Sequence, residues 1–323
     1  MSNQILNIAV DADKAGKRID KFLAEQLPSV TRSRLKKIID DKRVTIAGKV
    51  VKANHLVKAG EEIRIHFPEP PKQTLEPEDI PLDIVYEDRH LLVVNKPAGM
   101  IVHPAYGNYS GTLVNALLAH CERLSSVSGD VRPGLVHRLD KDTTGLLVVA
   151  KDNVTHVGLA RQLSKRKMER QYCAIVWGNL KSDKGTVEAP LARHHKERTR
   201  MAIHQEGKRA VTHYTVLERF VLTSFIQLQL ETGRTHQIRV HMNSIGHPVF
   251  GDSTYGGKGK QVSGLNHDRT IFFVRLFKEF KRQMLHARTL AFEHPITNQW
   301  VSFDSDIPGD IQALLGELEK TPV

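Results

Sequence analysis

The apolar positions of the first 67 residues predict a small unit of helices followed by strands. Apolar residues recur at helical spacing over residues 19–27, and residues 33–41 repeat the pattern in a second short helix. A turn at Ala47-Gly48 separates two short apolar runs and predicts a hairpin, and residues 62–67 alternate as a closing strand. We therefore expect a separate small α/β domain over residues 1–67.

Proline is concentrated in the stretch that follows. Five of the 14 prolines lie within residues 68–81, in the sequence PEPPKQTLEPEDIP. Such a stretch resists both helix and sheet and acts as a stiff spacer. We expect it to link the small domain to a larger one over residues 82–323.

The larger part of the chain contains more strand patterns than helix patterns. Candidate strands lie over residues 83–86, 91–94, 146–150, 171–177, 211–217 and 224–230. Candidate helices lie over residues 112–120, 153–165, 235–245 and 310–319. Because the strands outnumber the helices and no regular βαβ rhythm appears, we expect an α+β fold. Its core would be a mixed, mainly antiparallel β-sheet with flanking helices.

The charge balance indicates a polyanionic partner. Lys and Arg number 47 against 36 Asp and Glu, a formal net charge of +11, and an excess of this size favours nucleic acid. Part of it gathers on the outer side of the second predicted helix, at Arg32, Arg34, Lys36 and Lys37. A solvated helix face is the simpler interpretation, but cations greatly outnumber anions here, so we expect RNA phosphates to bind.

Composition excludes several other classes of protein. No apolar run approaches the roughly 20 residues of a membrane span, and the N-terminus has no secretory signal pattern, so we expect a cytoplasmic protein. The two cysteines, Cys121 and Cys173, are too few for a disulfide framework or a four-thiolate zinc site. His236 and His241 are not at the spacing of a helical zinc pair, so we expect no metal.

The segment best suited to chemistry is GLVHRLDKDTTGLLVVAK, residues 134–151. Asp140 lies there in a charged loop before a predicted strand, with Arg138 and Lys141 beside it. Cations this close favour the ionised carboxylate, which suits nucleophilic attack better than proton donation. Alone, the loop also allows a salt bridge between Asp140 and Arg138, or a magnesium-dependent aspartyl-phosphate enzyme. The phosphate chemistry needs further carboxylates, and the sequence offers no second acidic motif.

Two further segments carry candidate site residues. NKPAGMIVHP, residues 95–104, bends directly after a predicted buried strand and brings Lys96 and His103 near the strand end. KMERQYCAIVWG, residues 167–178, begins an apolar strand at Tyr172. The ring of Tyr172 can pack in the core or stack on a base. Taken alone, neither segment decides between a structural and a functional role.

A fourth segment, LETGRTHQIRVHM, covers residues 230–242. It turns at Gly233-Arg234 and enters a helix that we expect Thr235 to cap. Arg239 lies next to the apolar face of that helix, where partial burial would require an anionic partner. Asp140 is the candidate for that partner.

Together these segments resemble the RluA family of pseudouridine synthases. The strings NKPxGxxVHP, HRLDKDTTG, a Tyr-led strand and GRTHQIRVHM occur in this order in that family, and the resemblance continues to QMLHA at residues 283–287. The N-terminal segment resembles the S4 RNA-binding domain. The resemblance implies that Asp140 is the catalytic aspartate, that Tyr172 stacks on the target base and assists proton removal from C5, and that Arg239 pairs with the aspartate. It also implies that Arg138 helps to displace the target nucleotide from its stack.

The resemblance implies a cofactor-free enzyme that flips a uridine out of RNA and isomerises it. Its expected substrate is 23S ribosomal RNA or a precursor of the large ribosomal subunit, at the stem-loop of helix 69. We expect a monomer. Further expected RNA contacts, beside Arg138 and the basic helix, are Lys96, His103, Arg234 and His236. Two alternatives stay open: a family member for other large-subunit uridines, and a ribosome-assembly factor whose RNA binding outweighs catalysis.

Overall fold

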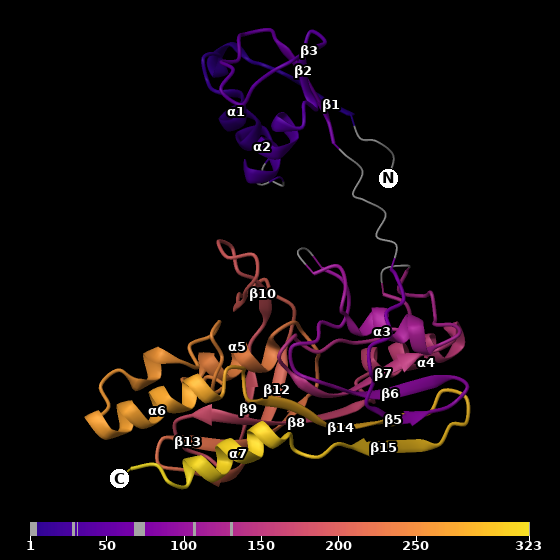
Figure 1. Cartoon of the computed structure of the whole chain (residues 1–323), viewed down its shortest axis with the longest axis vertical. Coiled ribbons are helices and arrows are strands. Elements are labelled where there is room, and N and C mark those ends of the chain that lie inside the picture. The colour runs from indigo at the N-terminus through magenta and orange to yellow at the C-terminus, as the bar shows by residue number, and fades with distance from the viewer. Residues whose placement is uncertain are drawn as a thin grey trace. The chain divides into compact units, whose positions relative to one another are not determined.

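A computed structural model describes the backbone of residues 5–27, 30, 32–67, 75–105, 108–129 and 132–322, and the side chains of all of these except 32–34 and 259–260. It divides the chain into two compact units, Met1–Thr74 and Leu75–Val323 (Figure 1). The first half of the predicted linker, residues 68–74, lies outside the described residues. The second half belongs to the second unit, where the Glu78 carboxylate accepts a hydrogen bond from the Gly111 amide at 3.0 Å.

The first unit has the expected helices, hairpin and closing strand. Its elements are β1 (Ile5–Ala9), a 3-10 turn (Ala12–Lys14), α1 (Ile19–Gln26), α2 (Arg32–Asp40), β2 (Val44–Ile46), β3 (Lys49–Val50) and β4 (Glu62–His66). The strands form an antiparallel sheet in the order β1-β4-β2-β3. Apolar residues of both helices, among them Phe22 and Leu35, pack with Ile63 and Ile65 of β4 in one core. The strand β1 was not predicted.

The second unit is built on a nine-stranded sheet with the order β5-β6-β7-β14-β8-β13-β12-β9, and β15 pairs with β14. Its strands are β5 (Ile84–Glu87), β6 (Leu91–Lys96), β7 (Thr144–Ala150), β8 (Glu169–Trp177), β9 (Lys184–Glu188), β12 (Val211–Arg219), β13 (Thr223–Leu230), β14 (Leu285–Glu293) and β15 (Trp300–Asp304). A separate hairpin joins β10 (Leu191–Arg193) and β11 (Met201–Ile203). Only β7 and β14 pair in parallel within the nine-stranded sheet, which confirms the predicted mixed, mainly antiparallel α+β fold.

Helices flank this sheet on both faces (Figure 1). They are α3 (Leu113–His120), α4 (Asn153–Ser164), α5 (Gln237–Ser244), α6 (His267–Glu279) and α7 (Gly309–Leu318), with a 3-10 turn at Gly259–Val262. Side chains of α3 and α5 pack on the face of β8 that carries Tyr172. Those of α6 and α7 pack on the opposite face with Trp177, and α4 packs against β6 and β7. None of the described helices is long and apolar enough to cross a membrane.

The structure corrects several sequence expectations. The helix α6 and the strands β9–β11, β14 and β15 were not predicted. Thr235 does not cap α5; that helix begins after His236, whose backbone is left-handed at φ 56° and whose side chain makes no capping bond. The local geometry of β7 depends on a glycine, because a Cβ at Gly145 would lie 2.2 Å from the carbonyl oxygen of Ala287 in β14. The close approach of β7 to β14 sets the position of the loop before β7, and this loop carries Asp140.

Candidate active site

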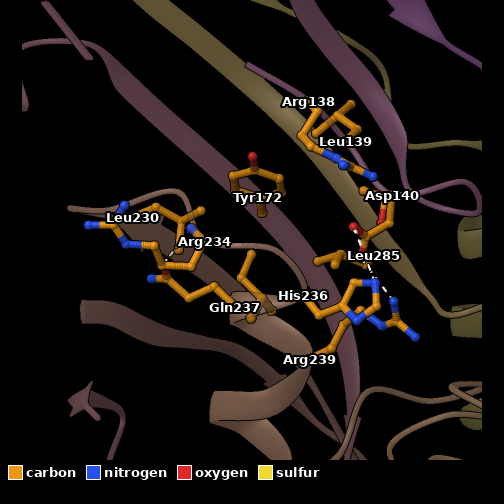
Figure 2. Close-up of a pocket in the computed structure, with 12 residues that line it drawn as sticks. Arg138, Leu139, Asp140, Tyr172, Leu230, Arg234, His236, Gln237, Arg239 and Leu285 are labelled. Atoms are coloured by element: carbon orange, nitrogen blue, oxygen red, sulfur yellow. Dashed lines mark hydrogen bonds and ion pairs between the residues drawn. The ribbon is translucent and has the colours of Figure 1, made fainter. Parts of the chain in front are cut away.

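The carboxylate of Asp140 lies in a pocket formed by the loop before β7 and by residues of β8, β13, β14 and α5 (Figure 2). Arg239 Nη1 donates a hydrogen bond to Asp140 Oδ2 at 2.9 Å, so the anionic partner predicted for Arg239 is present. Both side chains are largely enclosed, at 7% exposure for Arg239 and 15% for Asp140. His236 Nε2 lies 3.8 Å from the other carboxylate oxygen. In the described part of the chain Asp140 forms no ion pair with Arg138, so the simple salt-bridge alternative for this loop is not what the structure contains.

Arg239 is held from behind by a second, fully buried carboxylate. Its Nε and Nη2 donate to the two oxygens of Asp252 at 2.7 and 3.0 Å. The amides of Thr254 and Tyr255 also donate to Asp252. The guanidinium carbon of Arg239 lies over the Tyr255 ring, 5.0 Å from the ring centroid. Burial alone would lower the pKa of Arg239, but the hydrogen bonds and charge of Asp252, with those of Asp140, raise it above its usual range. The guanidinium is therefore a fixed cation with one nitrogen left for Asp140.

Tyr172 forms the aromatic wall of the pocket. It lies on β8 opposite Leu228 of β13 and Ala287 of β14, and its side chain is buried. Burial raises the pKa of its phenol, the charge of Asp140 adds to this effect, and Arg170 opposes it. The hydroxyl is thus protonated at neutral pH. Figure 2 shows the ring between the Asp140 side of the pocket and the side formed by Leu230 and Arg234.

A tyrosine orients the imidazole of His236 toward Asp140. The Tyr255 hydroxyl accepts a hydrogen bond from the Met201 amide at 2.8 Å and lies 2.7 Å from His236 Nδ1. If the hydroxyl donates its proton to Nδ1, then Nε2 carries the imidazole proton and presents it to the carboxylate. Burial lowers the pKa of His236, although Asp140 partly offsets it, and this favours the neutral ring.

Two arginines at the pocket are open to solvent. Arg138 and Arg234 both line it and are exposed, which is compatible with the RNA contacts predicted for them. In the first unit Lys36 and Lys37 are exposed on α2, whereas the side chains of Arg32 and Arg34 lie outside the described residues.

The structure contradicts the direct RNA contacts predicted for Lys96 and His103. Lys96 is 1% exposed, and its ammonium donates to the carbonyl oxygens of Pro97, Met100 and Lys141 at 2.7, 2.9 and 3.0 Å. Burial lowers its pKa to about 8. Lys96 therefore ties its own loop to the loop of Asp140. His103 is also buried, and this lowers its pKa to about 4. Neither side chain offers a surface to RNA.

Asp252 and Tyr255 were missed by sequence reasoning. Both lie in the string GDSTYGG, residues 251–257, where glycines on either side of an Asp and a Tyr were the available signal. Among the residues that the structure describes, no cluster of three or more His, Cys, Asp or Glu side chains could hold a metal ion.

Comparisons with known proteins agree with this arrangement. Residues 90–244 match the family described as RNA pseudouridylate synthase, and residues 17–63 match the S4 domain. The uncharacterized RNA pseudouridine synthase YlyB of Bacillus subtilis is 44% identical over 318 residues, which cover 98% of this chain and 99% of that protein. The ribosomal large subunit pseudouridine synthase D of Escherichia coli K12 is 43% identical over 311 residues, 96% of this chain and 93% of that one.

A solved structure shows the same likeness. Human RNA pseudouridylate synthase domain containing 4 superposes with a TM-score of 0.56 at 25% identity, covering 73% of this chain and 92% of the human chain. The pocket around Asp140 lies in the part of the chain that these comparisons cover, from the matched family segment to the C-terminal strands. The protein is thus a member of the RluA family of RNA pseudouridine synthases, which are isomerases, and carries an S4 domain in addition to its catalytic unit.

Proposed function

We propose that this enzyme isomerises uridines of 23S ribosomal RNA in the large ribosomal subunit or its precursor, at the stem-loop of helix 69. The support is that relatives sharing 43–47% identity over nearly the whole chain are described as ribosomal large subunit pseudouridine synthase D. The net charge of +11 and the exposed Lys36 and Lys37 of the S4 domain also favour a structured RNA substrate.

The reaction sets the demands on the pocket. The bond between N1 and C1′ must break, the uracil must turn, and C5 must bond to C1′. Since these atoms are hidden in a stacked helix, the nucleotide must first flip out, at a cost of a few kcal/mol. We assign Arg138, exposed at the pocket, to the space that the base leaves. The ring of Tyr172 then stacks on the flipped uracil.

The observation that carries the assignment of roles is the Asp140–Arg239 pair in a pocket walled by Tyr172. Asp140 either attacks C1′ as a nucleophile or removes the proton at C2′. Arg239, fixed by Asp252, holds the carboxylate in one orientation in either case. The raised pKa of Tyr172 favours stacking and hydrogen-bond donation over proton removal. The isomerisation is redox-neutral and transfers no group to a second molecule, so we propose no cofactor.

The test of the target is a map of pseudouridines in ribosomal RNA from cells with and without the gene. Loss of the helix 69 pseudouridines alone would support the proposal. Loss of other large-subunit pseudouridines, with helix 69 unchanged, would contradict it and favour the alternative within the family.

The test of the chemistry compares Asp140→Asn with Asp142→Asn, which removes a neighbouring charge from the same loop. Tritium release from RNA labelled at uridine C5 should stop in Asp140→Asn and continue in Asp142→Asn, while both variants still bind the RNA. Substantial turnover by Asp140→Asn would refute the catalytic role. If Asp140→Asn restored normal subunit assembly in cells that lack the gene, an RNA-binding role in assembly would outweigh catalysis.

A further inference from the structure

Arg170 is a buried cation without a partner in the described structure. It lies on β8, two residues before Tyr172 and on the same face of the strand. The residue is 7% exposed: its Nε is enclosed without an acceptor, whereas the two Nη atoms, which would meet a ligand, are not among the enclosed atoms. No hydrogen bond or ion pair joins its guanidinium to any residue that the structure describes. Because a buried charge is costly unless it is paired, this guanidinium is expected to meet an anion.

The carboxylates that flank Arg170 on β8 and at the end of the neighbouring β13 are engaged elsewhere or point away. Glu231 is the residue after β13, and it already accepts from Arg166, Arg209 and His213 at 3.1, 3.2 and 3.0 Å. Glu169 precedes Arg170 on β8, so strand alternation turns its side chain to the opposite face. The protein itself therefore leaves the anion position at Arg170 open.

The guanidinium lies against the turn between β13 and α5. A Cβ at Gly233 would lie 2.6 Å from Arg170 Nη1, so the glycine makes room for it. The residues on either side of this turn, Leu230 and Arg234, line the pocket together with Tyr172 (Figure 2). Together with burial, the charge of Arg170 lowers the pKa of His137 in the segment that leads to Asp140, to about 3. Arg170 thus lies beside the pocket, two residues from Tyr172 and against the turn that leads to Arg234.

We propose that Arg170 binds a backbone phosphate of the RNA next to the flipped uridine. This inference rests on the proposed position of that uridine between Asp140 and Tyr172. Uracil is neutral, so the anion that arrives with the substrate is a phosphate, and a guanidinium binds phosphate oxygens through two parallel hydrogen bonds. The phosphate would complete the pairing that the free protein lacks and would contribute to holding the nucleotide in its flipped position.

The experiment measures RNA binding in the Asp140→Asn background, where no turnover intervenes. The RNA is a stem-loop that the wild-type enzyme converts, and it is compared with versions that carry one neutral methylphosphonate at the phosphate 5′ or 3′ of the target uridine. Arg170→Gln should weaken binding of the unmodified RNA by roughly 10- to 100-fold, the range of a hydrogen bond between charged groups. One methylphosphonate should cost the Arg170 protein a similar factor and cost Arg170→Gln nothing further.

Arg166→Gln is the matched control, because it removes a more exposed arginine from the turn before β8 that is already paired with Glu231. It should change affinity less than about threefold and remain sensitive to the methylphosphonate. Arg170→Lys, which keeps the charge, should keep that sensitivity if Arg170→Gln fails to fold.

The proposal is overturned if the Arg170 protein binds both methylphosphonate RNAs as tightly as the unmodified RNA. It is equally overturned if the losses from Arg170→Gln and from the methylphosphonate add in full at both positions. Because the RNA is chosen by wild-type turnover, a wrong target appears as an absence of conversion before any variant is made. A wrong phosphate contact appears only in the comparison of Arg170→Gln with the methylphosphonate RNAs, where the two losses of affinity would add in full.

Discussion

Replacement of Asp252 by Asn tests whether Arg239 must be anchored in order to position Asp140. Asp252 Oδ1 accepts from Arg239 Nη2 and from the amides of Thr254 and Tyr255, whereas Oδ2 accepts from Arg239 Nε alone. The asparagine oxygen will therefore take the Oδ1 position. Its NH2 group then faces Arg239 Nε, which is also a donor, in place of a 2.7 Å charged hydrogen bond.

The cost follows from burial. Breaking a buried ion pair by removal of one partner costs about 3–5 kcal/mol, and the hydrogen bonds that survive at Oδ1 place Asp252→Asn near the lower limit. The guanidinium also becomes free to turn away from Asp140. A displacement of about 1 Å at a reacting group costs roughly 10²-fold in rate. We therefore expect a fall of about 3 kcal/mol in the free energy of unfolding and about 10²-fold in single-turnover rate.

The assays are equilibrium unfolding in urea and tritium release under single-turnover conditions with saturating RNA. RNA affinity should change little, because the exposed Arg138 and Arg234 remain in place. Asp183→Asn is the control, since it removes an exposed carboxylate that pairs with Arg219 at 2.6 Å, and it should cost less than about 1 kcal/mol and no activity. A rate for Asp252→Asn within twofold of wild type, with unchanged stability, would refute the anchoring role.

Two further predictions concern Tyr172 and His286. Tyr172→Phe should keep RNA affinity and lose only about 10-fold in rate if the ring mainly stacks; complete loss of tritium release would instead require the hydroxyl in proton transfer. His286 is fully buried, with Nδ1 2.9 Å from Thr144 Oγ1 and Nε2 3.0 Å from Ser305 Oγ. Burial and the nearby Arg282 lower its pKa to about 4. Above pH 6.5 the ring is neutral in both the folded and the unfolded state. As the pH drops from 6.5 to 4 the unfolded state takes up the proton first, so the free energy of unfolding falls by roughly 3 kcal/mol. Urea titrations from pH 7 to pH 4 should show this loss, and an equally steep loss in His286→Gln would contradict it.

The Asp140–Arg239 pair was predictable because one physical demand links the two residues. A cation beside the apolar face of a helix needs an anion, and the charged loop before β7 supplied the one candidate. Asp252, 13 residues after Arg239 in the chain, is the second anion that pairs with this cation. It lies in an irregular loop without periodicity, so no pattern indicated which way its side chain points.

The error at Lys96 arises from a choice of side-chain direction that the sequence does not reveal. A lysine near a strand end can extend into solvent or turn inward onto backbone carbonyls, and the sequence reads the same in both cases. The helix α6 was not predicted, although Phe273 and Leu276 recur in it at helical spacing and are buried.

The position of β14 in the sheet has a consequence for the order in which the protein forms during synthesis. This strand comes from residues 285–293, yet it lies between β7 and β8, the strands that carry the Asp140 loop and Tyr172 (Figure 1). A nascent chain on the ribosome can complete its S4 unit early, because that unit lies within the first 74 residues. The two walls of the pocket cannot be joined until almost the whole chain has emerged. The enzyme therefore gains its RNA-binding unit well before it gains the ability to alter a nucleotide.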